Sequence, residues 1–480
     1  MTIDQVQGTQ TAANAQAVRI EKDLVGECEV PAEAYYGVHT LRSVENFPIT
    51  GQTIGGYPEL VRGLAAVKAA AAKANLEFGK LTEEQADAIV QACEDIRAGR
   101  LHDQFVVDVI QGGAGTSTNM NANEVVANRA LEILGHARGD YQHLHPLEHV
   151  NVSQSTNDVY PTAARIALYV MADELLEALE AAAVAFDAKA EEFNDVAKLG
   201  RTQMQDAVPM TVGQEFGAFA AWVRDDAARI RTAREELLTV NLGGTAIGTG
   251  LNTPSGFADR VDAHLAEITG LSVRGADDRV AATPDLGAFV ALSSAIKIAA
   301  VHVSKICNDL RILSSGPGGG FGEILLPAVQ AGSSIMPGKV NPVIPEVVNQ
   351  VAFEVIGHDV TVSMAAEGGQ LQLNAFEPVV VKANVEQITH FAAALRTLTE
   401  RCVTGIEVNR EVMARHLDQT VGIVTALNTV LGYDLASQIA KEALASHRSV
   451  AELAVERGLL TEEQLSEMLD PLRQARPHEK

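Results

Sequence analysis

Four short polar segments of this chain concentrate residue types that could bind an anion. Each is rich in Gly, Ser, Thr, Asn or Gln and lies just upstream of a helix-like pattern; they span residues 112–119, 153–158, 200–203 and 332–342. The first N–H groups of a helix have no partner within it and carry the positive end of the helix dipole, so they attract anions. Hydroxyl and amide side chains add neutral hydrogen bonds. Several such ends together would suit a small dianion such as a dicarboxylate.

Each segment also has a purely structural interpretation. Ser, Thr, Asn and Asp commonly cap helix N-termini, and most clusters of these residues do only that. Thr211 and Gln214, downstream of the third segment, predict a capping box. Pro161 is predicted in the first turn of the helix that follows the second segment. The spacing leaves open whether the four ends meet in one site.

One cluster of potential metal ligands lies between the first two segments. It comprises His143, His145, Glu148 and His149. This spacing fits no standard zinc pattern, and Pro146 interrupts any shared helix face. We therefore predict no metal site in this chain.

Long helices must position the polar segments. Five stretches repeat apolar residues at spacings of four and three, which is typical of helices with an apolar face. The clearest runs from Leu292 to Leu313, and the others lie within residues 168–193, 216–237, 344–362 and 381–395. Apolar faces of this length must be buried against one another, so the pattern predicts a central five-helix bundle.

The helix expected around Leu292–Leu313 is apolar on more than one side. Phe289, Ile298 and Val301 all lie off its main seam. A helix that is apolar all round is buried all round, which favours further burial against other subunits. A single thick bundle within a monomer is the alternative. Lysines and a histidine interrupt the run, which argues against a membrane span.

The rest of the chain differs from this central stretch. Shorter helices are predicted over residues 59–76 and 83–98, and a strand-like piece over 34–38. We predict a disordered N-terminal tail followed by three domains. The divisions are residues 1–18 for the tail, 19–156 for a mixed, mainly helical N-terminal domain, 157–411 for the bundle, and 412–480 for a small helical C-terminal domain.

Composition narrows the class of protein. The chain has 480 residues and a formal net charge of −25, which argues against nucleic-acid binding because phosphate contact needs a basic surface. Its four cysteines form no CxxC pair, and a reducing cytoplasm suits that pattern. The first 18 residues lack the apolar core of a signal peptide. A cytoplasmic protein without a membrane partner is expected.

The segment GSSIMPGKVNP at residues 332–342 resembles the signature loop of the aspartase/fumarase superfamily, whose members cleave C–N or C–O bonds and release fumarate. The resemblance extends from Arg19 almost to the C-terminus. GRTQMQDAVPMTVGQEF at 200–216 and QSTND at 154–158 are most similar to the aspartase branch. Fumarases usually carry His where Gln203 stands and Ser in place of Thr156. The resemblance therefore implies reversible deamination of L-aspartate to fumarate and ammonia through an aci-carboxylate intermediate.

The resemblance also implies roles for eight residues. Ser333 would be the general base that removes the C3 proton, carried on a mobile loop that closes over the substrate. The other seven would bind substrate: Lys339 and Asn341 the α-carboxylate, Asn157 near the amino group, and Thr116, Ser155, Thr156 and Thr202 the β-carboxylate. Neither an organic cofactor nor a catalytic metal ion is implied.

For the fold, the resemblance implies a mainly α, three-domain aspartase/fumarase-like chain. Its five-helix bundle would form a twenty-helix core in a homotetramer, with composite active sites built from three subunits. The expected partners are small molecules and other copies of the chain.

Two departures from the family pattern and two rival functions remain. Gly318-Gly319-Gly320 stands where relatives usually continue with Arg, which affects how the signature loop is anchored. Leu147-Glu148 replaces the usual Asn-Asp, which weakens any accessory anion site there.

A class II fumarase is the alternative enzyme, with Gln203 as the discriminating feature. A non-catalytic structural protein on the same scaffold is the alternative outside enzymes.

Overall fold

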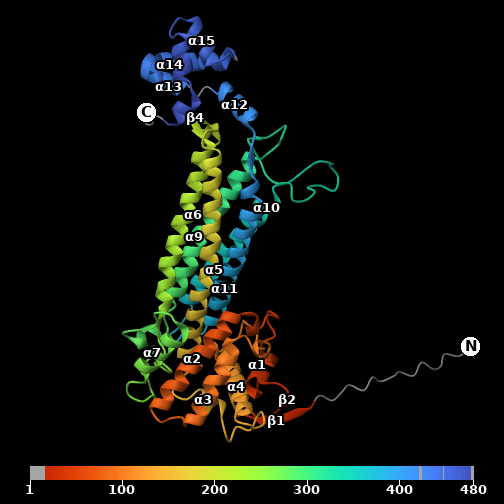
Figure 1. The fold of residues 1–480 in the computed structure, drawn as a ribbon, viewed down its shortest axis with the longest axis vertical. Helices are drawn as coiled ribbons and strands as arrows, with labels where there is room; N and C mark the ends of the chain where they lie inside the picture. The colour runs from red at the N-terminus through yellow and green to blue at the C-terminus, as the bar shows by residue number, and fades with distance from the viewer. Residues whose placement is uncertain (1–16, 421–423, 447, 477–480) are drawn as a thin grey trace, which may run out of the picture. The chain divides into compact units, whose positions relative to one another are not determined.

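The computed structural model describes residues 17–420, 424–446 and 448–476, which are mainly helical (Figure 1). Contacts divide the chain into two units. The first unit takes in the described residues of Met1–Val170, Arg234–Val290 and Thr361–Asn384, and the second those of Met171–Ala233, Ala291–Val360 and Val385–Lys480. The predicted division into a tail and three domains stays a prediction. Of the predicted tail, residues 1–16 lie outside the described residues, and Val18 already begins a strand.

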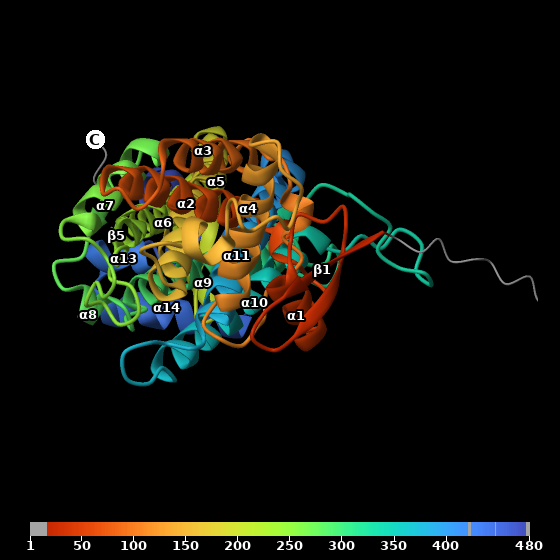
Figure 2. The same ribbon diagram turned by 90° about the horizontal axis from the view of Figure 1, so that it is seen from below.

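The first unit begins with an antiparallel hairpin and continues with short and medium helices. Its elements are β1 (Val18–Lys22), β2 (Glu27–Pro31), α1 (Val38–Asn46), α2 (Pro58–Glu77), α3 (Glu83–Arg97), α4 (Thr116–Ile133), α7 (Phe257–Thr269), α8 (Arg279–Ala282) and the parallel pair β5 (Thr239–Val240) and β6 (Arg274–Gly275). Helix α2 packs against α3 and α7, and α3 against α4 (Figure 2). The two helices predicted over 59–76 and 83–98 are confirmed as α2 and α3.

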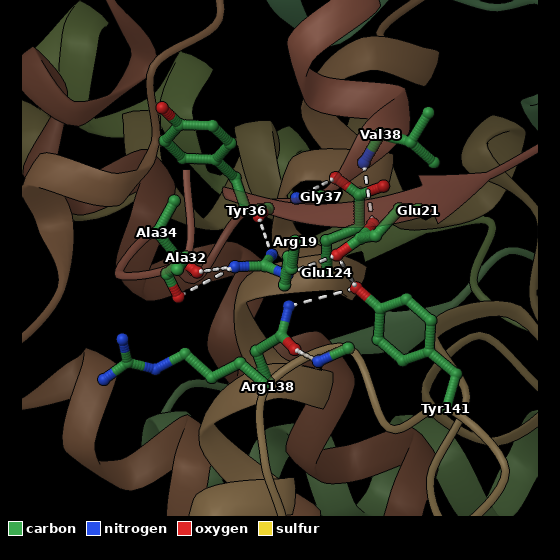
Figure 3. A network of polar contacts seen from close by, with 12 residues as sticks. Arg19, Glu21, Ala32, Ala34, Tyr36, Gly37, Val38, Glu124, Arg138 and Tyr141 are labelled. Carbon is green, nitrogen blue, oxygen red and sulfur yellow. Dashed lines mark hydrogen bonds and ion pairs between the residues drawn. The ribbon is translucent and has the colours of Figure 1, made fainter. Parts of the chain in front are cut away.

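The strand predicted over residues 34–38 is wrong. Residues 32–37 form turns and bends, and Val38 begins α1. The backbone N–H of Gly37 donates to Glu124 Oε2 at 2.8 Å, and that of Val38 donates to Glu21 Oε2 at 2.9 Å (Figure 3). Two buried carboxylates from distant elements therefore hold these donors at a helix N-terminus, where no strand ladder can use them.

Five long helices match the five predicted apolar seams. They are α5 (Thr156–Glu192), α6 (Val212–Arg234), α9 (Gly287–Leu313), α10 (Val343–Glu367) and α11 (Glu377–Arg401). In the second unit their turns run side by side (Figure 1), and seam residues such as Leu292 and Ile306 are fully buried. Polar bonds also join the helices: Ser293 Oγ donates to Asp359 Oδ1 at 2.9 Å, and Gln387 Nε2 to Ser293 Oγ at 3.0 Å. The predicted five-helix bundle is confirmed.

Helix α5 begins earlier than expected, because Thr156 is its first residue and Pro161 therefore lies beyond the first turn. Proline has no N–H to donate to the carbonyl four residues before it. That carbonyl, Asn157 O, instead accepts a hydrogen bond of 2.9 Å from Asn241 Nδ2. A side chain from a distant segment thus supplies the missing donor, and the helix passes through Pro161.

Among the described residues, one helix, α9, is long and apolar enough to cross a membrane by length and composition alone. Its polar side chains pair with neighbouring helices of the second unit, as His302 does with Asp226 on α6 at 2.8 Å. These contacts identify α9 as a core helix of the bundle.

The remaining elements of the second unit are small. They are the hairpin β3 (Ala197–Thr202) and β4 (Gln205–Thr211), the pair β7 (Ile324–Leu325) and β8 (Glu407–Val408), and the helices α12 (Arg410–Gln419), α13 (Val424–Leu431), α14 (Tyr433–Ser446), α15 (Val450–Glu456), α16 (Glu462–Met468) and α17 (Pro471–Ala475). The C-terminal helices share a small core of their own around Leu427, Ile439 and Leu453.

Candidate active site

Thr116 is the first residue of α4, directly after a glycine-rich turn. Gly113 and Gly115 have positive φ values of +96° and +85°, which favour glycine. A Cβ on Gly115 would lie 2.4 Å from Cγ of Tyr160, so only glycine lets this turn approach the start of α5. The Thr116 hydroxyl donates to Gly113 O at 2.7 Å, and its side chain is exposed at the helix N-terminus.

Ser155, Thr156 and Asn157 form the N-terminus of α5. Ser155 Oγ accepts the N–H of Asn157 at 3.2 Å, and Asp158 Oδ1 accepts the N–H of Ser155 at 3.0 Å. The other oxygen of Asp158 accepts the N–H groups of Gly243 and Thr245. Burial raises the pKa of Asp158 to about 6. This carboxylate thus joins the predicted binding segment to a second loop of the same unit.

A buried polar network connects the two helix N-termini. Asn119 Nδ2, on α4, donates to Thr156 Oγ1 at 3.0 Å and to Asn151 Oδ1 at 3.2 Å. Lys68 Nζ, on α2, donates to Asn151 Oδ1 at 2.9 Å and to Gln154 Oε1 at 3.0 Å. Lys68 is fully buried, and that burial lowers its pKa to about 7.

Of this network, the sequence predicted only Thr156 as a site residue; it assigned no role to Lys68, Asn119, Asn151 or Gln154. A signal existed for Lys68, which is the one charged residue in the run LAAVKAAAA of α2. A buried amino group needs oxygen acceptors, so a lysine in such a run points to a polar partner elsewhere. Asn119 and Asn151 carried no comparable signal, because polar residues at helix starts are common.

In the second unit, Thr202 ends β3 at the tip of a hairpin. Gln203 and Met204 have φ values of +55° and +64°, as a two-residue hairpin turn of the primed type requires. The neighbouring Arg201 Nη2 lies 2.7 Å from Oε1 of the buried Glu323. Burial acts to raise the pKa of Glu323, but Arg201, Lys198 and His416 outweigh it, so the pKa is lowered. The capping box predicted at Thr211 and Gln214 is confirmed by bonds of 3.0 Å in both directions.

The signature segment, residues 332–342, folds back on itself just before α10. Gly332 N–H donates to Lys339 O at 2.9 Å, and Asn341 Nδ2 donates to Gly332 O at 2.8 Å. Ser333 Oγ accepts the N–H groups of Ile335 and Met336 at 3.1 and 2.9 Å. Two backbone donors therefore point at the hydroxyl oxygen that the family resemblance assigns to proton removal.

Lys339 and Asn341 face a common cavity of about 890 Å³ in the second unit. The end of α9 and the glycine-rich turn after it also line this cavity, with Arg311 and Ser315 among the polar contributors. The cavity is large enough for a four-carbon acid, and its lining includes two cationic side chains, Lys339 and Arg311, against one anionic side chain, Glu346.

The eight predicted site residues divide between the two units. Thr116, Ser155, Thr156 and Asn157 lie at adjacent helix N-termini of the first unit, and Thr202, Ser333, Lys339 and Asn341 lie in the second. Each unit thus presents anion-binding groups of the kind that the sequence predicted. Their meeting in one site stays a prediction.

Two family models match this chain. A model described as Lyase matches residues 26–357, and one described as Fumarase C C-terminus matches residues 423–473. The first match covers more than half of the chain, so the chain belongs to this lyase family. The resemblance to the aspartase/fumarase superfamily, based on residues 332–342, is confirmed.

Individual relatives place the chain more closely. The aspartate ammonia-lyase of Pseudomonas fluorescens is 55% identical over 460 residues, 96% of both chains. That of Escherichia coli (strain K12) is 52% identical over 452 residues, 94% of this chain and 95% of that one. Both of these relatives are ammonia-lyases, and both have a higher sequence identity to this chain than a solved class II fumarase, which is 34% identical.

Two solved structures have the same fold. Fumarate lyase:delta crystallin from Brucella melitensis bound to cobalt gives a TM-score of 0.94 at 54% identity, covering 96% of this chain and 100% of that chain. Recombinant class II fumarase from Schistosoma mansoni gives 0.92 at 34% identity, with the same coverage. The mainly α aspartase/fumarase fold is confirmed.

Proposed function

We propose that this protein is an aspartate ammonia-lyase, a carbon–nitrogen lyase that reversibly converts L-aspartate to fumarate and ammonia. The observation that carries the proposal is 52–55% identity to aspartate ammonia-lyases along 94–96% of the chain. Gln203, which stands where fumarases usually carry His, agrees with it. We further propose that the enzyme works in the cytoplasm and needs no cofactor.

The chemistry requires donors aimed at a developing dianion. Removing the weakly acidic C3 proton moves negative charge onto the adjacent carboxylate, and the enzyme must bind that charge better than it binds the substrate. Thr116 and Thr156 stand at two helix N-termini, where backbone N–H groups and hydroxyls are already oriented. One such preoriented donor can contribute about 3 kcal/mol to lowering the barrier.

Ser333 is the proposed base. A serine hydroxyl removes a carbon-bound proton only where its alkoxide is strongly stabilised. The N–H groups of Ile335 and Met336, which already point at Ser333 Oγ, supply part of that stabilisation. Lys339, six residues on, supplies positive charge and would also hold the α-carboxylate together with Asn341.

We also propose a homotetramer with active sites composed from several subunits. The outer faces of α9 and α10 in the second unit carry exposed apolar residues: Ile298, Val301, Val347, Phe353 and Val360, which are 38–62% exposed. Apolar surface of this kind on a bundle supports burial against other copies. A twenty-helix core would cover it, and it would let helix N-termini of one copy complete the site of another.

A paired-substrate assay tests the function. Purified protein is supplied with L-aspartate or L-malate, and fumarate is followed by its ultraviolet absorbance. We expect turnover of aspartate and little of malate; turnover of malate alone would instead identify a fumarase, the candidate that the likeness to the class II fumarase structure keeps open. Turnover of neither substrate, or of any other dicarboxylate tested, would favour the structural protein.

The Ser333→Ala variant tests the base. We expect turnover to fall by about a thousandfold or more, with the melting temperature and the oligomer size by light scattering unchanged. Near-normal turnover in this variant would reject Ser333 as the base while leaving the substrate assignment intact.

A further inference from the structure

We propose that His136, Asp140 and His143 form a binding site for one divalent transition-metal ion. Within residues 17–420, 424–446 and 448–476, these three side chains each offer a ligand atom, and the three atoms lie within 4.8 Å of one another. Asp140 Oδ2 is 4.0 Å from His136 Nδ1 and 3.7 Å from His143 Nε2. Ligands of a tetrahedral ion at bonds of about 2.1 Å stand roughly 3.4 Å apart, so rotation of the side chains, without movement of the backbone, would complete the site.

The backbone that carries these ligands is fixed on both sides. Helix α4 ends at Ile133, and Gly135, two residues on, has a φ of +83° that permits the N–H of His136 to donate back to Leu131 O at 2.9 Å. The N–H of Gly139, next to Asp140, donates to Asn128 Oδ1 at 2.7 Å. A preordered loop of this kind reduces the entropy that metal binding would cost.

Tyr141 anchors the other side of Asp140. Its hydroxyl donates to Glu21 Oε1 at 3.0 Å and accepts from Asn128 Nδ2 at 3.1 Å, within the network that also holds Arg19 and Glu124 (Figure 3). Gly139 and Tyr141, the residues directly before and after Asp140, are therefore both hydrogen-bonded to buried side chains. The Asp140 carboxylate lies within 4.0 Å of both imidazoles.

In the described part of the chain, no strong hydrogen bond occupies the three proposed ligand atoms. Among the described residues, neither the Asp140 carboxylate nor the His136 ring makes a side-chain hydrogen bond. His143 Nε2 lies 3.4 Å from the Gln142 amide nitrogen, a long and weak contact that a metal ion would displace. All three side chains are between 31% and 44% exposed, so an ion can reach them from solvent.

The neighbouring histidines are different. His145 Nδ1 accepts the N–H groups of Leu147 and Glu148, and His149 Nδ1 accepts the N–H of His145 at 2.7 Å. These nitrogens serve as caps for the short helical turn over Pro146–Val150. The ligand set considered from the sequence, His143 with His145, Glu148 and His149, is thus replaced by one that shares only His143.

The present ring arrangement shows what binding requires. The imidazoles of His136 and His143 are stacked, with centroids 3.8 Å apart and planes 9° apart. A metal lies in the plane of each imidazole that binds it, so one ring must turn out of the stack. His143, with 44% of its side chain exposed, has the room to do so.

Two imidazoles and one carboxylate favour a borderline ion such as Zn²⁺, Co²⁺ or Ni²⁺ over Mg²⁺ or Ca²⁺, which prefer oxygen ligands. Water would fill the remaining positions. None of the proposed substrate-binding residues belongs to this cluster, so the ion would fasten the loop between α4 and the Ser153–Asp158 segment without entering the chemistry. The proposal is independent of the proposed lyase function.

The test is a Co²⁺ titration of the full-length, chelator-treated protein, followed by visible absorption and by calorimetry with Zn²⁺. We expect one site per chain and an excess of Mg²⁺ that does not compete, because Mg²⁺ prefers oxygen ligands. His143→Ala and Asp140→Asn should each weaken binding by about tenfold or more.

Two control variants locate the ion. His149→Ala, six residues after His143 in the sequence, and His390→Ala, an exposed histidine of the second unit, should both bind Co²⁺ as wild type does. Unchanged affinity in His143→Ala and Asp140→Asn would overturn the proposal, as would loss of binding in His149→Ala. Melting temperatures of all four variants confirm that each is folded, and His136→Gln supplies a third ligand variant if one of the others unfolds.

Discussion

Asn119 Nδ2 lies 3.0 Å from Thr156 Oγ1 and donates a hydrogen bond to it. This bond joins the first turn of α4 to the first residue of α5, so the two helix N-termini share one support. Because the amide occupies a lone pair of the threonine oxygen, the Thr156 O–H hydrogen is left to point elsewhere. In the proposed enzyme it would point at the substrate carboxylate.

Replacing Asn119 with alanine should therefore impair substrate binding. Loss of one positioning hydrogen bond of about 1.5 kcal/mol predicts a roughly tenfold fall in kcat/KM for L-aspartate, mostly through KM. Asn121→Ala is the matched control: it is a buried asparagine of the same helix, but it bonds Val106 N and Gln104 O instead. We expect Asn121→Ala to lower the melting temperature with KM unchanged; equal KM values in the two variants would contradict the role of Asn119.

The signature segment offers a test by glycine replacement. A Cβ at Gly332 would lie 2.4 Å from Lys339 O and 2.8 Å from Asn341 N, both backbone atoms that cannot turn aside. Gly332→Ala should open the fold-back of this loop and lower kcat by about tenfold or more. Gly318→Ala, in the glycine-rich turn, meets no atom within 4 Å and serves as the control, with kcat close to wild type. Steady-state kinetics on aspartate would decide, and equal kcat values in the two variants would show that the fold-back is dispensable.

The long helices were predictable from sequence because their apolar seams repeat with the period of the helix, and burial of a seam such as Leu292 to Leu313 follows from its composition. The start of α5 was not predictable. The helix can pass through Pro161 because Asn241 Nδ2 donates a hydrogen bond to Asn157 O, the carbonyl 84 residues before it in the sequence. Local propensity contains no information about such a donor.

The candidate site was likewise predictable only in part. The polar helix starts and the signature segment were predictable as anion-binding groups, because their residue types and positions carry that chemistry within a few residues. The support behind them was not, because Lys68, Asn119 and Asn151 come together from three separate elements. Only the tertiary fold reveals that a buried amino group lies behind the predicted binding segment.

The cap on α1 predicts a stability effect at Glu124. Its carboxylate accepts the N–H groups of Gly37 and His39 and both donors of Thr40, although burial raises its pKa to about 7. In Glu124→Gln one oxygen becomes an NH₂ group that faces other N–H donors. We expect a loss of about 1–3 kcal/mol in unfolding free energy, measured by thermal or denaturant melting. Glu132→Gln, a partly exposed glutamate of the same helix, should cost less than about 1 kcal/mol; equal losses would rule out the buried cap as the cause.

The buried Lys68 predicts how stability varies above neutral pH. Burial lowers its pKa from 10.5 to about 7 in the folded chain, so between these values the unfolded chain binds more protons. Its contribution to stability is therefore greatest above pH 10.5 and is lost as the pH falls through about 7, with a slope of up to about 1.4 kcal/mol per pH unit. Lys68→Met lacks this dependence. The raised pKa values of Asp158 and Glu124, about 6 and about 7, place their own effects on stability below this pH range.

Melting curves at pH values from about 7 to about 9 test this dependence. As the pH rises, the unfolding free energy of wild type should increase relative to that of Lys68→Met. Lys73→Met, partly exposed on the same helix, is the control for the substitution. A constant difference between wild type and Lys68→Met across this range would mean that Lys68 stays charged in the folded protein, held so by Asn151 and Gln154.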